Sequence, residues 1–262
     1  MKPHWELAFK SAWELHSLIV KKDVSPVEII KDALKRLEEL NPTLNAFLTV
    51  TPEIAIEEAK KAEKAVMSNQ QLGMLHGLPI SIKDHISTAG IRTTSGSLIF
   101  KNNVPNRDDL IVQRLKSAGS ISLGKTNLPE FGMIAATENF LGDDCVNPWD
   151  ITRISGGSSG GASASVAAGI TPFSQGSDGG GSIRIPASAC GLVGFKPPHG
   201  RNPQEAPFNH DQYCVVGPMA RTVKDCALMQ NVMSGPHPRD TVSYTHLRAH
   251  ETEADLVCRL LL

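Results

Sequence analysis

The sequence predicts an α/β protein in which helices cover both faces of a β-sheet. From residue 78 onward, short apolar runs alternate with segments of helical periodicity, as expected for strands that are connected by helices. The preceding residues, 1–70, carry strong helix signals. Hydrophobic residues make up 40% of the chain and charged residues 20%, which is the composition of a globular protein with a buried core.

Residues 1–70 are predicted to be a helical segment that covers the sheet. Ser25-Pro26-Val27-Glu28 has the form of a capping box with proline at the first helical position, and apolar residues follow it at helical spacing. A second helix is expected to begin at Thr51-Pro52-Glu53 and to run to about residue 68. Neither helix carries an obvious chemical group.

The later elements are predicted from the periodicity and length of each segment, and they make residues 71–240 the core of the domain. We expect strands at 78–82, 120–123 and 170–174, and helices at 109–118, 158–168 and 221–233. Residues 241–262 differ in texture from the rest of the chain. They are interpreted either as one more helix or as a non-native tail, and no function is assigned to them.

Charge and cysteine content argue against several classes of function. The chain has 26 basic and 27 acidic residues, so it lacks the global positive field that holds nucleic acid. Five cysteines without a CxxC pair favour a reduced, cytoplasmic protein over a disulfide framework or a zinc knuckle. No signal peptide or membrane-spanning run is visible. The histidines form no HxH or HExxH pair, so a metal site is not expected. No organic cofactor is expected either.

Two clusters of glycine and serine carry most of the functional information. Residues 155–161 read SGGSSGG and residues 177–184 read SDGGGSIR. Consecutive glycines imply tight turns or the close approach of another group. Neither cluster fits a phosphate-binding loop or a dinucleotide fingerprint. A flexible linker is disfavoured because ordered-looking apolar and Ala-rich segments follow both clusters.

Three further catalytic patterns deserve comparison with the sequence. Gly156–Gly160 matches GxSxG, but a nucleophile elbow needs a hydrophobic strand directly before it, and residues 147–153 do not predict one. Ser122–Lys125 matches SxxK, but Gly124 lies in a predicted transition from strand to loop, and no KTG segment is present. A Ser-His-Asp triad stays open, although no spacing favours it.

Lys83 stands out because it ends the apolar run that begins at Gly77. A lysine at the end of a strand usually lies on the surface. The functional alternative is a partly buried amine whose pKa is depressed, so that the neutral form acts as a base.

Taken together, these segments resemble the amidase signature family. The resemblance rests on Ile82-Lys83-Asp84, the GGSSGG run at 156–161 and the segment 178–197, and it covers residues 5–240. It implies a mixed β-sheet with α-helices on both faces. It also implies hydrolysis of a carboxamide C–N bond, through an acyl-enzyme, to a carboxylate and an amine or ammonia. The family's domain is about twice as long, so we expect this chain to be an N-terminal portion.

The resemblance also implies roles for individual residues. Ser182 is expected to be the nucleophile, Ser158 the bridging serine after a cis peptide bond, and Lys83 the base. The backbone N–H groups of Gly179, Gly180 and Gly181 are expected to form the oxyanion hole, with Ser159, Asp178 and Arg184 as supports. Lys83 can accept a proton only when neutral, so its pKa must fall from about 10.4 toward about 7–8.

Three interpretations of function stay open. The form DGGGSIRIPA resembles stand-alone bacterial amidases that act on a small-molecule amide, and Pro129 favours this reading because many amidotransferase subunits have Asp there. The first alternative is the glutaminase subunit of a tRNA-dependent amidotransferase. The second is a catalytically inactive fragment that folds incompletely. An α/β-hydrolase esterase is a more distant fourth. A homodimer is compatible with the family, and no nucleic-acid or membrane partner is expected.

Overall fold

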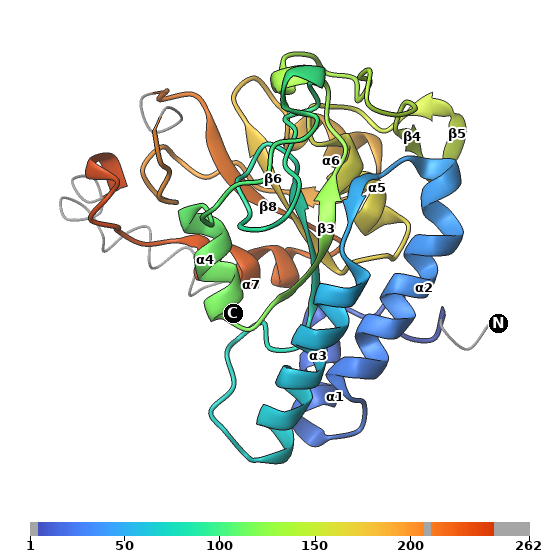
Figure 1. The fold of residues 1–262 in the computed structure, drawn as a ribbon, viewed down its shortest axis with the longest axis vertical. Coiled ribbons are helices and arrows are strands. Elements are labelled where there is room, and N and C mark those ends of the chain that lie inside the picture. The colour runs from blue at the N-terminus through green and yellow to red at the C-terminus, as the bar shows by residue number, and fades with distance from the viewer. Residues whose placement is uncertain (1–4, 207–210, 244–262) are drawn as a thin grey trace.

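A six-stranded mixed sheet forms the centre of the molecule (Figure 1). The structure is a computed structural model that describes residues 5–206 and 211–243. The strand order is β1-β3-β2-β6-β8-β7. The bounds are Phe47–Val50 for β1, Pro79–Lys83 for β2, Ile121–Thr126 for β3, Phe173–Asp178 for β6, Val193–Gly194 for β7 and Val215–Ala220 for β8. The central strands β3, β2 and β6 are parallel, whereas β1, β8 and β7 pair antiparallel.

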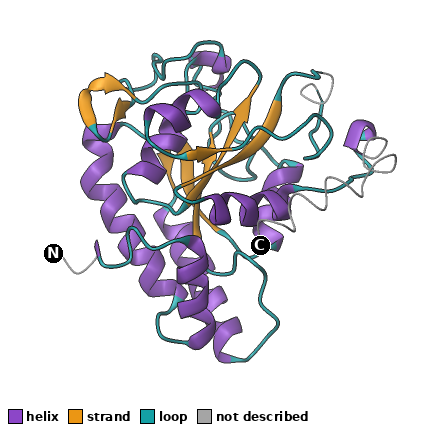
Figure 2. Ribbon diagram, turned by 180° about the vertical axis from the view of Figure 1, so that it is seen from behind, coloured by secondary structure: helices purple, strands orange, loops and turns teal. Residues whose placement is uncertain are grey.

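Helices pack on both faces of this sheet (Figures 1 and 2). Their bounds are Ala12–Lys21 for α1, Pro26–Leu44 for α2, Pro52–Met67 for α3, Leu110–Ser117 for α4, Gly160–Ala167 for α5, Arg184–Ala189 for α6 and Val223–Met233 for α7. One apolar cluster joins α1, α4 and α7 to β2, β6 and β8, and another joins α2, α3 and α5 to β1 and β3. The α/β fold with a mixed, helix-flanked sheet is therefore confirmed.

The two predicted N-terminal helices form as expected. In α2, the Ser25 hydroxyl accepts from the Glu28 backbone N–H at 3.1 Å, and Glu28 accepts from the Ser25 backbone N–H at 2.8 Å. This reciprocal pair satisfies two backbone donors that would otherwise lack partners at a helix start. A second capping box, between Ser11 and Glu14, begins α1.

The structure differs from the prediction in several elements. The strand expected at 170–174 begins instead at Phe173. The Ile170 N–H donates to the Ser165 carbonyl at the end of α5, so it is not available to a strand. Pro172 has no N–H and cannot donate to a sheet. Strands β1, β7 and β8 and helix α6 were not predicted. The expectation for residues 241–262 lies outside the described residues, apart from 241–243.

The prediction that no strand precedes Gly156 was wrong. Residues Asp150–Ile154 form β5, which pairs with β4 (Val146–Asn147) in a small separate sheet. All five residues of β5 are exposed, so β5 is not the buried, central strand that a nucleophile elbow requires. The argument against an elbow therefore stands on burial rather than on the absence of a strand.

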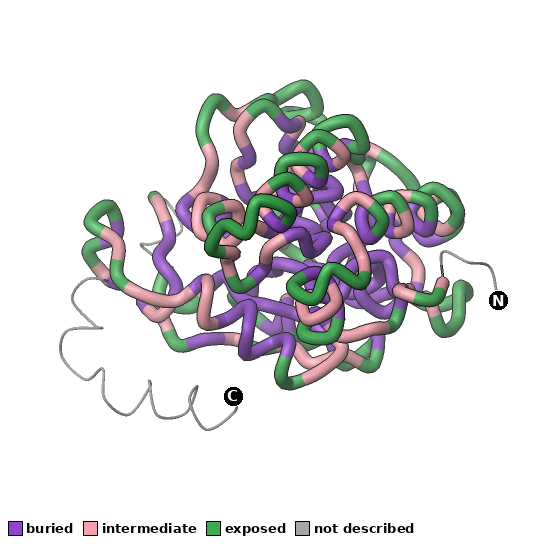
Figure 3. The backbone as a smooth tube through the Cα atoms, turned by 90° about the horizontal axis from the view of Figure 1, so that it is seen from below, coloured by how far each residue is buried: buried purple, intermediate pink, exposed green. Residues whose placement is uncertain are grey.

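Buried segments gather in the interior of the molecule (Figure 3). Every residue of α5 is buried. Its glycines permit this close packing. A Cβ added at Gly161 would lie 2.4 Å from the Ala46 carbonyl oxygen and 2.4 Å from the Asn127 nitrogen. Small residues therefore bring the start of α5 close to the ends of the sheet strands.

Within residues 5–206 and 211–243, no helix is long and apolar enough to cross a lipid bilayer. The same residues contain no group of three or more His, Cys, Asp and Glu side chains arranged to hold a metal ion.

Candidate active site

The sequence-predicted site residues meet at one edge of the sheet. Lys83 is the last residue of β2, and Asp178 is the last residue of the parallel neighbour β6. The carboxyl ends of parallel strands lie at the same edge, where sites of α/β proteins commonly form. Ser158 and Ser159 directly precede α5 at this edge. Tertiary packing thus brings together segments that are far apart in the sequence.

Lys83 is fully buried, with no exposed surface. Its side-chain nitrogen Nζ donates to the Ser158 hydroxyl at 2.7 Å and to the Ser177 hydroxyl at 3.0 Å. Burial lowers the pKa of Lys83 to about 7, against the opposing effects of Cys214 and Asp178. Near neutral pH a substantial fraction of this lysine is therefore a neutral amine that can accept a proton.

Ser158 lies in the bottom of the site and is 2% exposed. The Gly157–Ser158 peptide bond is cis. Gly132 is close to Ser158, since an added Cβ there would lie 3.1 Å from the Ser158 hydroxyl oxygen. Lys83, Gly132 and Ser158 line one cavity.

Ser182 is half-buried and lines the same cavity as Lys83 and Ser158, which has a volume of about 330 Å³. Gly179 and Gly180 also line this cavity and are exposed. The Gly181 N–H, by contrast, donates to the Asp178 carboxylate at 2.8 Å. Of the three N–H groups expected to form the oxyanion hole, that of Gly181 is therefore taken by Asp178.

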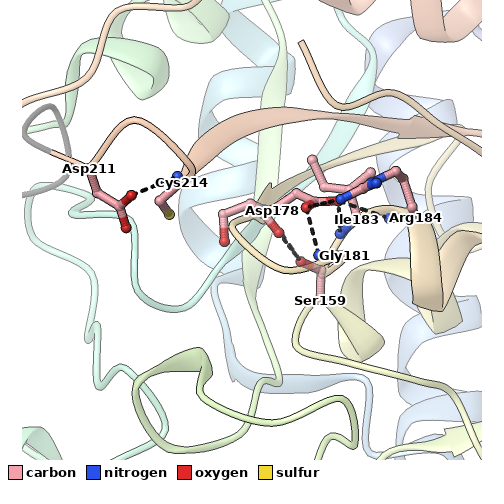
Figure 4. A network of polar contacts seen from close by, with 8 residues as sticks. Ser159, Asp178, Gly181, Ile183, Arg184, Asp211 and Cys214 are labelled. Atoms are coloured by element: carbon pink, nitrogen blue, oxygen red, sulfur yellow. Dashed lines mark hydrogen bonds and ion pairs between the residues drawn. The ribbon is translucent and has the colours of Figure 1, made fainter. Parts of the chain in front are cut away.

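Asp178 holds the turn that carries Ser182 (Figure 4). Its buried carboxylate accepts three backbone N–H groups and two guanidinium N–H groups, from Gly181, Ile183 and Arg184, at 2.8–3.3 Å. Burial acts to raise the pKa of Asp178, but the hydrogen bonds from Arg184 and the backbone outweigh it, and the net pKa is lowered. Asp178 therefore stays ionised and fixes the turn.

Ser159 ties the same turn to the sheet. Its hydroxyl donates to the Ser177 carbonyl at 3.2 Å, and its backbone N–H donates to the Ser182 carbonyl at 3.2 Å. The three expected supports, Ser159, Asp178 and Arg184, thus all contact the segment around Ser182.

Several cavity residues were not predicted from the sequence. Ser177, which begins the SDGGGSIR cluster but was given no role, is the second acceptor of Lys83. His85 also lines the cavity. Burial and the neighbouring Lys83 and Lys125 lower the pKa of His85 well below its usual range, so its imidazole is neutral. Asp211 and Cys214 also line the cavity, and the Cys214 backbone N–H donates to the Asp211 carboxylate (Figure 4).

Residues 28–256 match the family model described as Amidase. The chain belongs to the amidase family. The resemblance to the amidase signature family is thereby confirmed, and the match extends beyond residue 240, where we expected it to stop.

The chain is similar in sequence to curated proteins and in structure to solved members of this family. The A subunit of glutamyl-tRNA(Gln) amidotransferase from Heliobacterium modesticaldum is 45% identical over 242 residues, covering 91% of this chain and 49% of the relative. Its counterpart from Gloeothece citriformis is 44% identical over 234 residues, covering 88% and 48%. A bacterial aryl acylamidase of the amidase signature family superposes with a TM-score of 0.86 at 36% identity, covering 90% of this chain and 50% of that one. A peptide amidase from Stenotrophomonas maltophilia gives 0.83 at 29% identity, covering 92% and 51%. This amidase chain spans about half the length of the curated relatives it matches.

Replacing Asp178 with Asn should destabilise the protein by about 1–3 kcal/mol at pH 7, because an amide cannot accept all the donors that the carboxylate accepts. Thermal unfolding measures this effect, with Asp23→Asn as the control, since the Asp23 side chain is exposed. The folded-state pKa of Asp178 is lowered, so its stabilisation is present above its unfolded pKa of about 3.9 and is lost as the pH falls further. The difference between wild type and variant should therefore shrink below that pH. Equal melting temperatures at pH 7 would contradict the assigned role.

Proposed function

We propose that this protein hydrolyses carboxamide C–N bonds through an acyl-enzyme on Ser182. The observation that carries the proposal is the buried contact of 2.7 Å between Lys83 Nζ and the Ser158 hydroxyl, inside the cavity that Ser182 lines. A serine hydroxyl needs a base to attack an amide carbonyl. Lys83, whose pKa is about 7, is a suitable base near neutral pH.

In the proposed reaction, the Ser182 hydroxyl oxygen attacks the carbonyl carbon and forms the C–O bond of a tetrahedral intermediate. The Ser182 proton passes to Ser158 as the Ser158 proton passes to neutral Lys83. The N–H groups of Gly179 and Gly180 stabilise the oxyanion, and one such donor typically contributes about 2.7–4 kcal/mol. The intermediate collapses as the C–N bond breaks, and the Lys83 ammonium returns a proton through Ser158 to the leaving nitrogen. Water then hydrolyses the acyl-enzyme by the same relay.

The first test is covalent labelling of the 262-residue chain with a fluorophosphonate, followed by intact mass spectrometry. We expect one adduct, which is lost in Ser182→Ala and in Lys83→Ala, because one variant lacks the nucleophile and the other lacks its base. Ser188→Ala, which removes an exposed serine of α6, serves as the control and should label normally. Labelling that survives Ser182→Ala would place the nucleophile elsewhere.

The labelling rate should also depend on pH. Lys83 acts only as the neutral amine, and its pKa is about 7. Below that pH the rate should therefore fall about tenfold per pH unit, and above about pH 8 it should level off. The measurement is the initial labelling rate across this range. A rate that stays constant through neutral pH would rule out Lys83 as the base.

The finer function that we propose is that of a glutaminase subunit working with a partner protein. Its support is the match to glutamyl-tRNA(Gln) amidotransferase A subunits at 43–45% identity over most of this chain. Our preference for a stand-alone amidase rested on the DGGGSIRIPA form and on Pro129, and the relatives support the alternative better. Structural neighbours that are amidases at 29–36% identity keep the stand-alone amidase as a second candidate.

Trapping the acyl-enzyme distinguishes these two candidates. Rapid mixing of the chain with glutamine should give a glutamyl ester on Ser182, visible by intact mass and absent from Ser182→Ala, because the carboxamide of glutamine is the group that the proposed glutaminase cleaves. A simple aliphatic carboxamide serves as the comparison substrate. An acyl adduct from the aliphatic amide alone would favour the stand-alone amidase and contradict the glutaminase proposal.

A further inference from the structure

A second fully buried lysine, Lys125, lies one strand away from Lys83. Lys125 is on β3, opposite Ile82 in the parallel pairing with β2, whereas Lys83 lies opposite Thr126. Neighbouring positions of a strand point to opposite faces, so the two lysine side chains lie on opposite faces of the sheet. Lys125 therefore serves a purpose other than contact with Ser158.

The partners of Lys125 all belong to the loop that follows β2, residues 84–97. Its Nζ donates to the Thr88 hydroxyl at 2.8 Å, to the Thr93 hydroxyl at 3.2 Å and to the Ile86 carbonyl. An ammonium group has three N–H donors and no acceptor, so these three oxygens satisfy it completely. The Thr88 and Thr93 hydroxyls donate to backbone carbonyls of the same loop. The lone pairs of the hydroxyl oxygens are therefore free to accept from Lys125. The Lys125 side chain thus joins three points of one loop.

The same loop is held at its base by Asp84, which follows Lys83 directly. The buried Asp84 carboxylate accepts from the Thr94 backbone N–H at 2.9 Å and from the Thr94 hydroxyl. The Ser95 N–H donates to the Asp84 carbonyl at 3.1 Å. Burial raises the pKa of Asp84, and the neighbouring Lys125 opposes this rise. Together, the two residues fix both halves of the loop.

Residues 95–97, at the C-terminal end of this loop, contact the segment that forms one wall of the cavity. The Ser95 carbonyl accepts from the Phe131 N–H at 2.8 Å, and the Ser97 hydroxyl donates to Glu130 at 2.7 Å. An added Cβ at Gly96 would lie 2.7 Å from the Leu128 carbonyl oxygen, so the two segments are in close contact. Phe131 itself has a φ of 51°, a left-handed conformation that a non-glycine residue adopts only when its surroundings hold it there.

We propose that Lys125 is a positioning residue that, through the loop 84–97, holds Phe131 and Gly132 against the substrate opposite Ser158. The presence of a substrate here rests on the proposed function, whereas the link from Lys125 to the wall does not. Phe131 and Gly132 line the cavity with Ser182. Lys125 thereby controls how tightly the cavity binds the acyl group, whereas Lys83 controls proton transfer.

The test compares Lys125→Met with a matched pair at one of its partners. Thr93→Val keeps the shape of the side chain and removes the hydroxyl acceptor, whereas Thr93→Ser keeps the acceptor. The first readout is amide hydrogen exchange of the peptide 129–134, which reports on the Phe131 N–H and does not require catalysis. We expect exchange to accelerate about tenfold or more in Lys125→Met and Thr93→Val, with little change in Thr93→Ser and in peptides of α7.

The second readout is fluorophosphonate labelling, resolved into probe affinity and maximal rate. Displacement of the wall should weaken probe affinity about tenfold or more, because small displacements of positioning groups are costly. The maximal rate and its pH midpoint, which report on Lys83, should change little. A variant that is merely less stable would instead lower the fraction labelled and leave the affinity of the folded fraction unchanged.

The outcomes separate the two proposals. Unchanged exchange at 129–134 in Thr93→Val overturns the positioning role, and this variant decides the matter even if Lys125→Met does not fold. Accelerated exchange with unchanged probe affinity also overturns it, because the wall would then not govern binding. If the wild-type chain is not labelled by the fluorophosphonate, the proposed function is overturned. The hydrogen-exchange measurement still tests the link between Lys125 and the wall, because it does not require catalysis.

Discussion

The burial of one lysine amine against two serine hydroxyls is the constraint on which the rest of this structure depends. Placing an ammonium in the interior is costly unless it is hydrogen-bonded, and the usual response is a lowered pKa. Lys83 meets both conditions, with hydroxyl partners at 2.7 and 3.0 Å and a pKa of about 7. The two hydroxyl partners are neutral, so neither restores the charged form. A carboxylate in place of Ser158 or Ser177 would raise the pKa and remove the base.

This environment exists because three kinds of backbone meet at one edge of the sheet. The parallel strands β2 and β6 deliver Lys83 and Ser177 side by side, and α5 brings Ser158 over them. The approach of α5 depends on glycine, since a side chain at Gly160 would collide with the Thr137 and Ser155 hydroxyls. The turn that carries Ser182 is then fixed from behind by Asp178. The glycine-rich segments thus serve packing first, and the chemistry follows from that packing.

Much of this arrangement could be predicted from the sequence, and the elements that were missed have physical reasons. A capping box and apolar periodicity predicted α2, and the segment Thr51-Pro52-Glu53 predicted the start of α3, because these signals are local. Strand β8 was missed because VVGPMA contains Gly and Pro, and its identity as a strand comes from pairing with all six residues of β6. The same holds in the site. Motifs singled out Lys83, Ser158 and Ser182 as candidates, whereas no motif assigned a role to Ser177 or His85, whose place in the cavity depends on how distant segments pack. A run of glycines likewise does not predict that the Gly181 N–H donates to the Asp178 carboxylate.

Lys83 and Lys125 show why a perturbed pKa alone does not identify a base. Both lysines are fully buried, and burial lowers the pKa of each to about 7. Lys125 has three acceptors that satisfy all three of its N–H groups, and its threonine partners have already committed their protons to carbonyls. It has no hydroxyl from which to take a proton. Lys83 faces Ser158, whose hydroxyl opens toward the cavity lined by Ser182. The direction in which the neighbouring hydroxyl protons can move therefore separates a lysine suited to proton transfer from one suited to holding a loop.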